Sequence, residues 1–378
     1  MPCRVPDCVN SAVRPLVSML LALDASPAVR PNPSGTEVYA REIITHLAST
    51  NRGHTMRLYA NTVSPPPWSP ANVEWRLLPF PRLWTHWRFR RALRAEQPDV
   101  VFVPSHVLPL FLDLPAVVTI HDVGHRHVPS SYRPSTWLYL EWMTRSIARR
   151  AARLIAVSQA TADDLGRFYG VPPERITVIH SGVDDAFRPP TPAEIARVRD
   201  RYGLPSGYFL YLGRAHPRKN LPVLLAAYQA ARRSGLTAGL VLAGPGHQRS
   251  AGDGVQVLGY VPREDLPALY GGALALTLPS LFEGFGFEVL EAMRCGTAVL
   301  ASTAGSLPEI AGQAALLADP HQVPAWTQAL DRLASEVPLR QQLIERGAAW
   351  SAGFSWDRAA SATWTVLEAA GPPPHDRP

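Results

Sequence analysis

The sequence predicts an α/β protein with two doubly wound parallel sheets, and three observations carry the prediction. Short apolar runs alternate with helical segments along nearly the whole chain, which is typical of parallel sheets covered by helices. A stretch rich in proline and charge at 187–207 separates two such series. The length of 378 residues is enough for two ordinary domains, each with its own core.

The expected strands fall into two groups, one on each side of this linker. The first group is 16–23, 56–60, 99–103, 116–120, 153–157 and 176–179, and the second is 208–212, 239–243, 255–258, 274–278 and 297–301. We therefore expect a flexible leader, two Rossmann-like domains facing across a cleft, a final helix and a disordered tail. Their expected bounds are 1–13, 14–187, 188–354, 355–370 and 371–378.

The composition restricts the partners and the compartment. A net charge of +6 and a pI near 9.5 favour anionic partners such as nucleotides or a lipid surface. Nucleic acid is not expected, because no recognition motif is present and the arginines are not concentrated on one module. Three scattered cysteines indicate a reducing cytoplasm. The apolar run after Arg14 resembles a short signal peptide, but a first buried strand leading through a turn into a helix explains more of these residues.

The segment 279–302 (PSLFEGFGFEVLEAMRCGTAVLAS) carries the strongest functional signal. It follows a strand and contains a glycine-interrupted loop, a helix closed at Gly296 and a further strand. Gly284 and Gly286 leave backbone N–H groups free at the helix start to face an anion. Glu283 and Glu291 lie eight residues apart across this junction. An anion-binding helix start with two carboxylates suits a ligand that is part phosphate and part polyol, which indicates a nucleotide sugar.

Two cations follow the first strand of the second group. Arg214 and Lys219 are five residues apart, in a turn and at the start of an apolar helix. They would converge on one phosphate group. The alternative is a solvated basic turn. Their presence in the same domain as Glu283 favours the phosphate role.

Other candidates lie at the ends of predicted strands, where ligands bind in such sheets. Gly35 would allow a diphosphate to approach the first domain, although a plain turn is equally compatible. Tyr260 and Val261 would flank the base and ribose, or only punctuate a turn. His121 would contact substrate or be a satisfied buried histidine. The histidine-rich run at 121–127 does not have the spacing of a zinc site, so no metal is expected.

One basic and aromatic cluster occurs at 83–94 (LWTHWRFRRALR). At helical spacing one side carries arginine and tryptophan, and the opposite side is apolar. The first side would suit a membrane interface or a lipid-phosphate acceptor, or its arginines would only solvate a helix. Its members are Trp84, Trp87, Arg90, Arg91 and Arg94, opposite Phe89, Ala92 and Leu93.

With these features in place, the chain resembles glycosyltransferase family 4, the retaining nucleotide-sugar transferases of the GT-B fold. The resemblance covers about residues 16–368. Its segments are SGTEVYAREI, PDVVFVPSHVLPL, VVTIHD, RLIAVSQATADDL, VIHSGVD, YLGR followed by KN, LGYV, EGFGFEVLEAM and SLPEIAG. The EGFGFEVLEAM segment is the most specific of these. VVTIHD and PSHVLPL are most similar to the mannosyl- and rhamnosyltransferase branch.

The resemblance implies a role for each candidate. Glu283 would bind the donor sugar and Glu291 the ribose, while Arg214 and Lys219 would neutralise the diphosphate without a divalent metal or another cofactor. His121 would lie beside the reacting sugar, and the final helix would cross back onto the first domain. The loop amides that would hold sugar and phosphate belong to Gly284, Phe285, Gly286, Phe287 and Glu288.

One residue departs from the family pattern. Glu288 stands where a proline or a similar apolar residue is common, and a second carboxylate there would alter sugar preference.

The expected activity is retaining transfer of a hexosyl group, with mannose favoured, to a glycan or lipid-linked acceptor. The enzyme would act in the cytoplasm, at the inner face of the membrane. The alternatives are a nucleotide-sugar epimerase or hydrolase of the same fold, and an inactive partner subunit.

Overall fold

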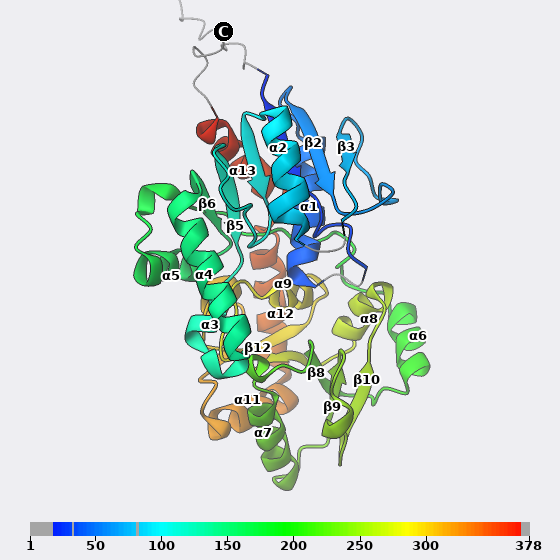
Figure 1. Cartoon of the computed structure of the whole chain (residues 1–378). Helices are drawn as coiled ribbons and strands as arrows, with labels where there is room; N and C mark the ends of the chain where they lie inside the picture. The colour runs from blue at the N-terminus through cyan, green and yellow to red at the C-terminus, as the bar shows by residue number, and fades with distance from the viewer. Residues whose placement is uncertain (1–17, 32–33, 81–82, 372–378) are drawn as a thin grey trace, which may run out of the picture.

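The computed structural model describes residues 18–31, 34–80 and 83–371. The expected leader at 1–13 and nearly all of the expected tail lie outside these residues. The described strands form two separate, fully parallel sheets, each with helices on both faces (Figure 1). Both sheets change strand order next to their first strand, and ligands of doubly wound folds bind at such points. The predicted α/β class with two doubly wound parallel sheets is therefore confirmed.

The N-terminal sheet has seven strands in the order β3-β2-β1-β4-β5-β6-β7. Its central strands are short apolar runs with nearly every side chain buried, as expected for parallel strands covered on both faces. The strands are β1 (Leu20–Asp24), β2 (Thr55–Ala60), β3 (Glu74–Leu77), β4 (Val100–Val103), β5 (Ala116–Ile120), β6 (Arg153–Ala156) and β7 (Ile176–Val178).

The helices around this sheet begin with α1, whose start is capped by Ser34 and Glu37. The Glu37 carboxylate accepts from the Ser34 N–H at 3.0 Å, which satisfies a donor at the helix start. The helices are α1 (Gly35–Ser49), α2 (Arg90–Glu96), α3 (Gly124–His127), α4 (Pro134–Arg150) and α5 (Gln159–Tyr169).

The C-terminal sheet has six strands in the order β10-β9-β8-β11-β12-β13. They are β8 (Tyr208–Leu212), β9 (Gly239–Ala243), β10 (Val255–Gly259), β11 (Ala275–Leu278), β12 (Ala298–Ser302) and β13 (Leu316–Ala318). The helices of this part are α6 (Pro192–Tyr202), α7 (Leu221–Arg233), α8 (Leu266–Gly271), α9 (Phe287–Arg294), α10 (Leu307–Ala311), α11 (Val323–Ser335) and α12 (Val337–Ser351).

The strands β3 and β13 were not predicted from the sequence. Each lies at the edge of its sheet, and they are four and three residues long. Their side chains are mostly half-exposed or exposed, so neither segment is the apolar run that marks a buried strand.

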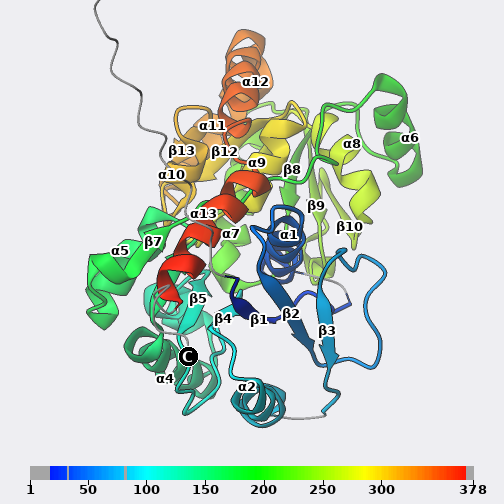
Figure 2. The same cartoon turned by 90° about the horizontal axis from the view of Figure 1, so that it is seen from above.

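The last helix, α13 (Trp356–Ala370), leaves the C-terminal domain and packs against α1 of the N-terminal domain, as Figures 1 and 2 show. Trp364 is fully buried, and its indole Nε1 donates to the Leu47 carbonyl at 3.3 Å. Arg52 of the N-terminal domain also pairs with Glu368 at 2.9 Å. The predicted return of this helix to the first domain is therefore confirmed.

The two domains share one continuous apolar cluster. It includes β1 and α1 on one side and β8, β11 and α9 on the other. Aromatic rings bridge the junction: Phe287 of α9 stacks on Trp356 of α13 at 6.2 Å, and Phe285 meets His180 of the N-terminal domain at 6.4 Å. None of the described helices has the length and apolar character needed to cross a bilayer.

Candidate active site

The loop between β11 and α9 lies at the carboxyl end of the C-terminal sheet, against the N-terminal domain. A Cβ atom at Gly284 would stand 1.9 Å from the His121 carbonyl oxygen, so only glycine permits this approach. The Ser158 hydroxyl, at the start of α5, donates to the Gly284 carbonyl at 2.7 Å. The predicted loop is therefore part of the contact between the domains.

Glu283 is the centre of a buried charge cluster within this loop. Its Oε2 lies 2.8 Å from Arg218 Nη1, and its Oε1 lies 2.9 Å from Lys219 Nζ. The Ser280 hydroxyl donates to Oε1 at 2.6 Å. Burial opposes ionisation, but the charges of Lys219 and Arg218 outweigh it and lower the pKa of Glu283 to about 2. Glu283 is therefore a carboxylate at neutral pH.

The two cations come from a single 3₁₀ turn, Pro217–Lys219, between β8 and α7. Asn220 ends this turn in a left-handed conformation (φ 52°), and its side-chain amide donates to the Pro279 carbonyl at 3.1 Å. This hydrogen bond ties the turn to the Glu283 loop. Lys219 also pairs with Glu288 at 2.9 Å. The structure thus brings Lys219 into contact with Glu283.

The second cation of this cluster is Arg218, which was not predicted from the sequence. Arg214 had been expected to converge with Lys219, but it lies exposed before the turn. Among the described residues, no hydrogen bond or ion pair joins its side chain to the cluster. The close spacing of Arg218, Lys219 and Asn220 was the available signal, because all three lie where the chain turns into α7.

Glu291 lies on α9, about one turn beyond Glu288. Its Oε2 accepts a hydrogen bond from the Tyr270 hydroxyl at 2.8 Å. Burial, followed by the nearby charge of Glu288, raises the pKa of Glu291 to about 7. The two acids of the motif therefore have opposite environments: one is fixed as a carboxylate, and the other titrates near neutral pH.

The N-terminal domain contributes His121 and Gly35 to the same region. The His121 Nε2 donates to the Pro104 carbonyl at 2.8 Å, which leaves Nδ1 as the acceptor, and burial lowers the pKa of the ring. A Cβ at Gly35 would lie 3.4 Å from the Phe287 ring. The structure therefore brings Gly35 and His121 to the Glu283 loop from across the domain junction.

The other histidines of this segment have separate partners. His125 Nε2 lies 3.0 Å from the Tyr169 hydroxyl and 3.3 Å from Glu141. His127 pairs with Asp164 at 2.7 Å and stacks on Phe282, with ring centres 4.2 Å apart. Their contacts hold the loop and its helices in place.

The two residues predicted to bind the base and ribose follow the end of β10, and their side chains differ in exposure. Tyr260 is 69% exposed, whereas Val261 is buried in the core shared by the two domains. The Val261 side chain is therefore enclosed by that core. Only its backbone is left for the contact expected of it.

The basic and aromatic cluster of the first domain differs from the prediction at Trp84. Residues 85–89 form a π-helical turn, which is wider than an α-helix and shifts the helical period assumed for this segment. Trp84 is consequently buried, stacking on Phe89 with ring centres 5.0 Å apart. Trp87, Arg91 and Arg94 remain exposed, as expected.

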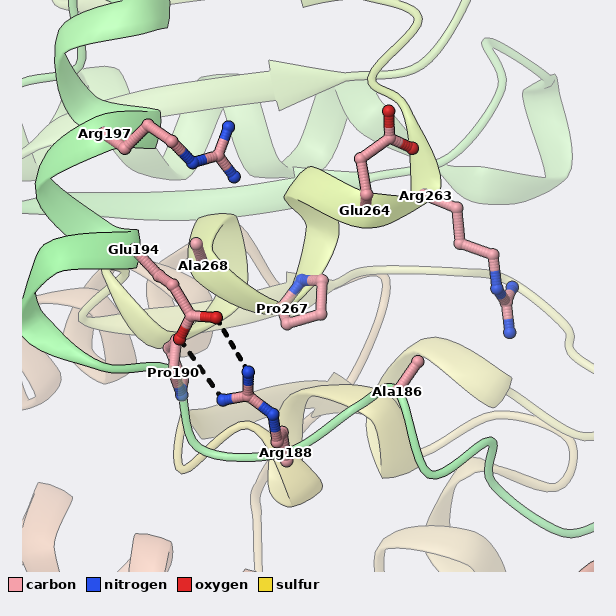
Figure 3. Close-up of a pocket in the computed structure, with 9 residues that line it drawn as sticks. All are labelled: Ala186, Arg188, Pro190, Glu194, Arg197, Arg263, Glu264, Pro267 and Ala268. Atoms are coloured by element: carbon pink, nitrogen blue, oxygen red, sulfur yellow. Dashed lines mark hydrogen bonds and ion pairs between the residues drawn. The ribbon is translucent and has the colours of Figure 1, made fainter.

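A pocket of about 390 Å³ lies away from this cluster, between the interdomain linker, α6 and α8 (Figure 3). Its cations are neutralised by neighbouring acids: Arg188 pairs with Glu194 at 2.7 Å, and Arg197 pairs with Asp265 at 2.8 Å. It contains none of the residues that the sequence singled out.

Comparison with known proteins identifies the family of this chain. The family model for glycosyltransferase family 4 matches residues 33–187, and the model for glycosyl transferases group 1 matches 197–350. The O-antigen chain mannosyltransferase B of Escherichia coli is 33% identical over 285 residues, which are 72% of this chain and 74% of that protein. The chain belongs to glycosyltransferase family 4.

A second relative agrees with this assignment over a shorter part of the chain. This family 4 transferase is 34% identical over 245 residues to the D-inositol 3-phosphate glycosyltransferase of Salinispora arenicola, covering 57% of this chain and 54% of that protein.

Solved structures show the GT-B fold. The glycosyltransferase WaaG and the Anabaena protein HepE with UDP-glucose each give a TM-score of 0.72 at 18% identity, over 92% of this chain and 99% of theirs. The GT-B fold and the glycosyltransferase activity predicted from the sequence are confirmed.

Proposed function

We propose that the enzyme transfers a hexosyl group from a nucleoside diphosphate sugar to an acceptor hydroxyl with retention of anomeric configuration. The observation that supports this most is the Glu283–Arg218–Lys219 cluster, which lies at the carboxyl end of the sheet and next to His121 of the other domain. Sugar hydroxyls and a diphosphate together require both carboxylate and cationic groups within one site.

In the proposed reaction, the bond between the sugar C1 and the departing phosphate oxygen breaks, and a bond to the acceptor oxygen forms on the same face. The acceptor proton passes to the leaving phosphate. Lys219, Arg218, the exposed Arg214 and the amides at the start of α9 would stabilise the charge on the diphosphate. Glu283 would accept hydrogen bonds from the sugar, and Glu291 from the ribose.

We further propose that no divalent metal or other cofactor is required. The two cations of the 3₁₀ turn would take the part that a metal ion plays in other phosphate transfers. Adding a chelator to the purified enzyme should leave its turnover unchanged, and a loss of turnover that Mg²⁺ or Mn²⁺ restores would contradict this.

We also propose which sugar is transferred and which class of donor carries it. Mannose is favoured by the similarity to a protein named as an O-antigen mannosyltransferase, and the expected acceptor is a glycan or lipid-linked glycan of a polysaccharide pathway. A nucleotide-sugar donor is supported by the structure of HepE with UDP-glucose.

Thermal shifts with GDP, UDP, ADP, dTDP and their sugars test the donor assignment. A ligand at about 100 times its Kd adds roughly 2.7 kcal/mol to the free energy of unfolding, which is visible as a higher Tm. Proton NMR of the reaction with and without acceptor then separates transfer from hydrolysis and epimerisation. Release of free hexose alone, or an inverted product anomer, would contradict the proposal.

We also propose that the enzyme contacts the inner face of the membrane through its first domain. The exposed side of the π-turn and α2 carries Trp87, Arg91 and Arg94, and the Phe111 ring packs under Arg90. Replacing Arg90, Arg91 and Arg94 by Glu together should reduce sedimentation with anionic liposomes. Unchanged sedimentation would contradict this contact.

A further inference from the structure

Glu288, the residue that departs from the family pattern, contacts the proposed phosphate site directly. It stands in the first turn of α9, with its Oε1 2.9 Å from Lys219 Nζ. The same ammonium group lies 2.9 Å from Glu283 Oε1. Lys219 is only 12% exposed and is thus shared by two carboxylates before any ligand arrives.

The two carboxylates are held very differently. Glu283 is fixed by Arg218, Ser280 and Lys219 and is 8% exposed. Glu288 is 21% exposed, and Lys219 is the one hydrogen-bond or ion-pair partner that the described residues give it. Of the two acids, Glu288 is therefore the one free to leave Lys219 when an anion enters.

The cluster carries no net positive charge before a ligand arrives. Arg218 and Lys219 supply two positive charges, and Glu283 and Glu288 supply two negative ones. Asp122 of the N-terminal domain adds a third carboxylate that the Arg218 charge stabilises. A diphosphate brings further negative charge, so it competes with these carboxylates for Lys219.

We propose that Glu288 competes with the diphosphate for Lys219, weakening the binding of the nucleotide and speeding its release after transfer. This inference rests on the proposed role of Lys219 in binding the diphosphate. When the nucleotide is bound, Glu288 turns towards solvent. When the product leaves, Glu288 returns to Lys219 and compensates its charge.

The charge of Glu288 also acts on the neighbouring acid of the motif. The Glu288 charge contributes to the raised pKa of Glu291, three residues further along the same helix. Like charges at this helical spacing repel each other. The charge of Glu288 therefore acts both on Lys219, proposed to bind the diphosphate, and on Glu291, proposed to bind the ribose.

The test is calorimetric titration of GDP, UDP, ADP and dTDP into the wild-type protein and the Glu288→Gln variant. We expect the variant to bind the preferred diphosphate about tenfold more tightly, mainly through a slower off-rate, which is the size expected of one partly exposed charge. The ligand-free variant should melt slightly lower, because its ion pair is lost. A merely structural residue would not tighten binding while lowering stability.

Two further variants make the result specific. Glu264→Gln, an exposed acid in the same domain, should leave the affinity unchanged. In a Lys219→Met background, Glu288→Gln should no longer tighten binding, because the group for which it competes is gone.

Unchanged or weaker binding by Glu288→Gln, with the wild type binding normally, would overturn the inference alone. Binding that appears in the Glu288→Gln variant but not in the wild type would support it. Binding of no diphosphate by either protein would overturn both the inference and the proposed function.

Discussion

Replacing Glu283 by Gln should destabilise the protein strongly at neutral pH, before any effect on activity is considered. The carboxylate is 8% exposed and compensates both Arg218 and Lys219. Its pKa of about 2, against 4.5 for an ordinary glutamate, corresponds to a stabilisation of about 3 kcal/mol. Loss of one partner of a buried pair costs a similar amount, about 3–5 kcal/mol.

The sign of the pH dependence follows from the lowered pKa. The stabilisation by Glu283 is fully present above the unfolded-state pKa of 4.5 and is lost as the pH falls towards 2. Urea unfolding of the wild type and Glu283→Gln, followed by tryptophan fluorescence, should therefore differ by about 3 kcal/mol at pH 7. The difference should begin to shrink below pH 4.5.

Glu345→Gln serves as the matched control, because Glu345 is exposed on α12. Its unfolding free energy should lie within about 0.5 kcal/mol of the wild type. A Glu283→Gln variant as stable as this control at pH 7 would refute the reasoning, since the two cations would then not depend on the carboxylate.

Three further changes test other parts of the structure. Glu291→Gln should raise the Tm at pH 8 but not at pH 4. The pKa of Glu291 is raised from 4.5 to about 7, so ionisation of this carboxyl destabilises the fold as the pH rises through that range. An equal change in Tm at both pH values would contradict this. Gly284→Ala should force the domains apart at His121 and increase the radius of gyration in X-ray scattering, whereas Gly252→Ala, which has open space around it, should not. Trp364→Ala should cost about 3–5 kcal/mol in urea unfolding, and a smaller loss would mean that α13 is not firmly docked.

The sequence was sufficient for those features that depend on local pattern. Buried parallel strands are short apolar runs, so most strands of both sheets could be predicted from them. That Lys219 and Glu283 lie in the same region could be predicted because both follow strands of one parallel sheet, and their ion pair is new from the structure. The edge strand β3 was missed because its half-exposed side chains leave no such pattern.

Other features depend on contacts that no local pattern contains. Arg218 joins the Glu283 cluster because of one 3₁₀ turn, which spacing alone cannot reveal, and the contact of Arg214 with a diphosphate stays a prediction. Trp84 is buried because a π-turn changes the helical period, a feature that is rare enough to escape periodicity analysis. The contact of Gly284 with His121 arises only when the two domains meet.

We propose that this chain transfers hexose from a nucleotide sugar by means of Lys219. Its most direct test is a single-turnover assay of the wild type and Lys219→Met with the donor that gives the largest thermal shift, with the glycosylated acceptor quantified by mass spectrometry. We expect the wild type to form the product and Lys219→Met to form it orders of magnitude more slowly. Equal rates, with both proteins shown to be folded by circular dichroism, would contradict the account.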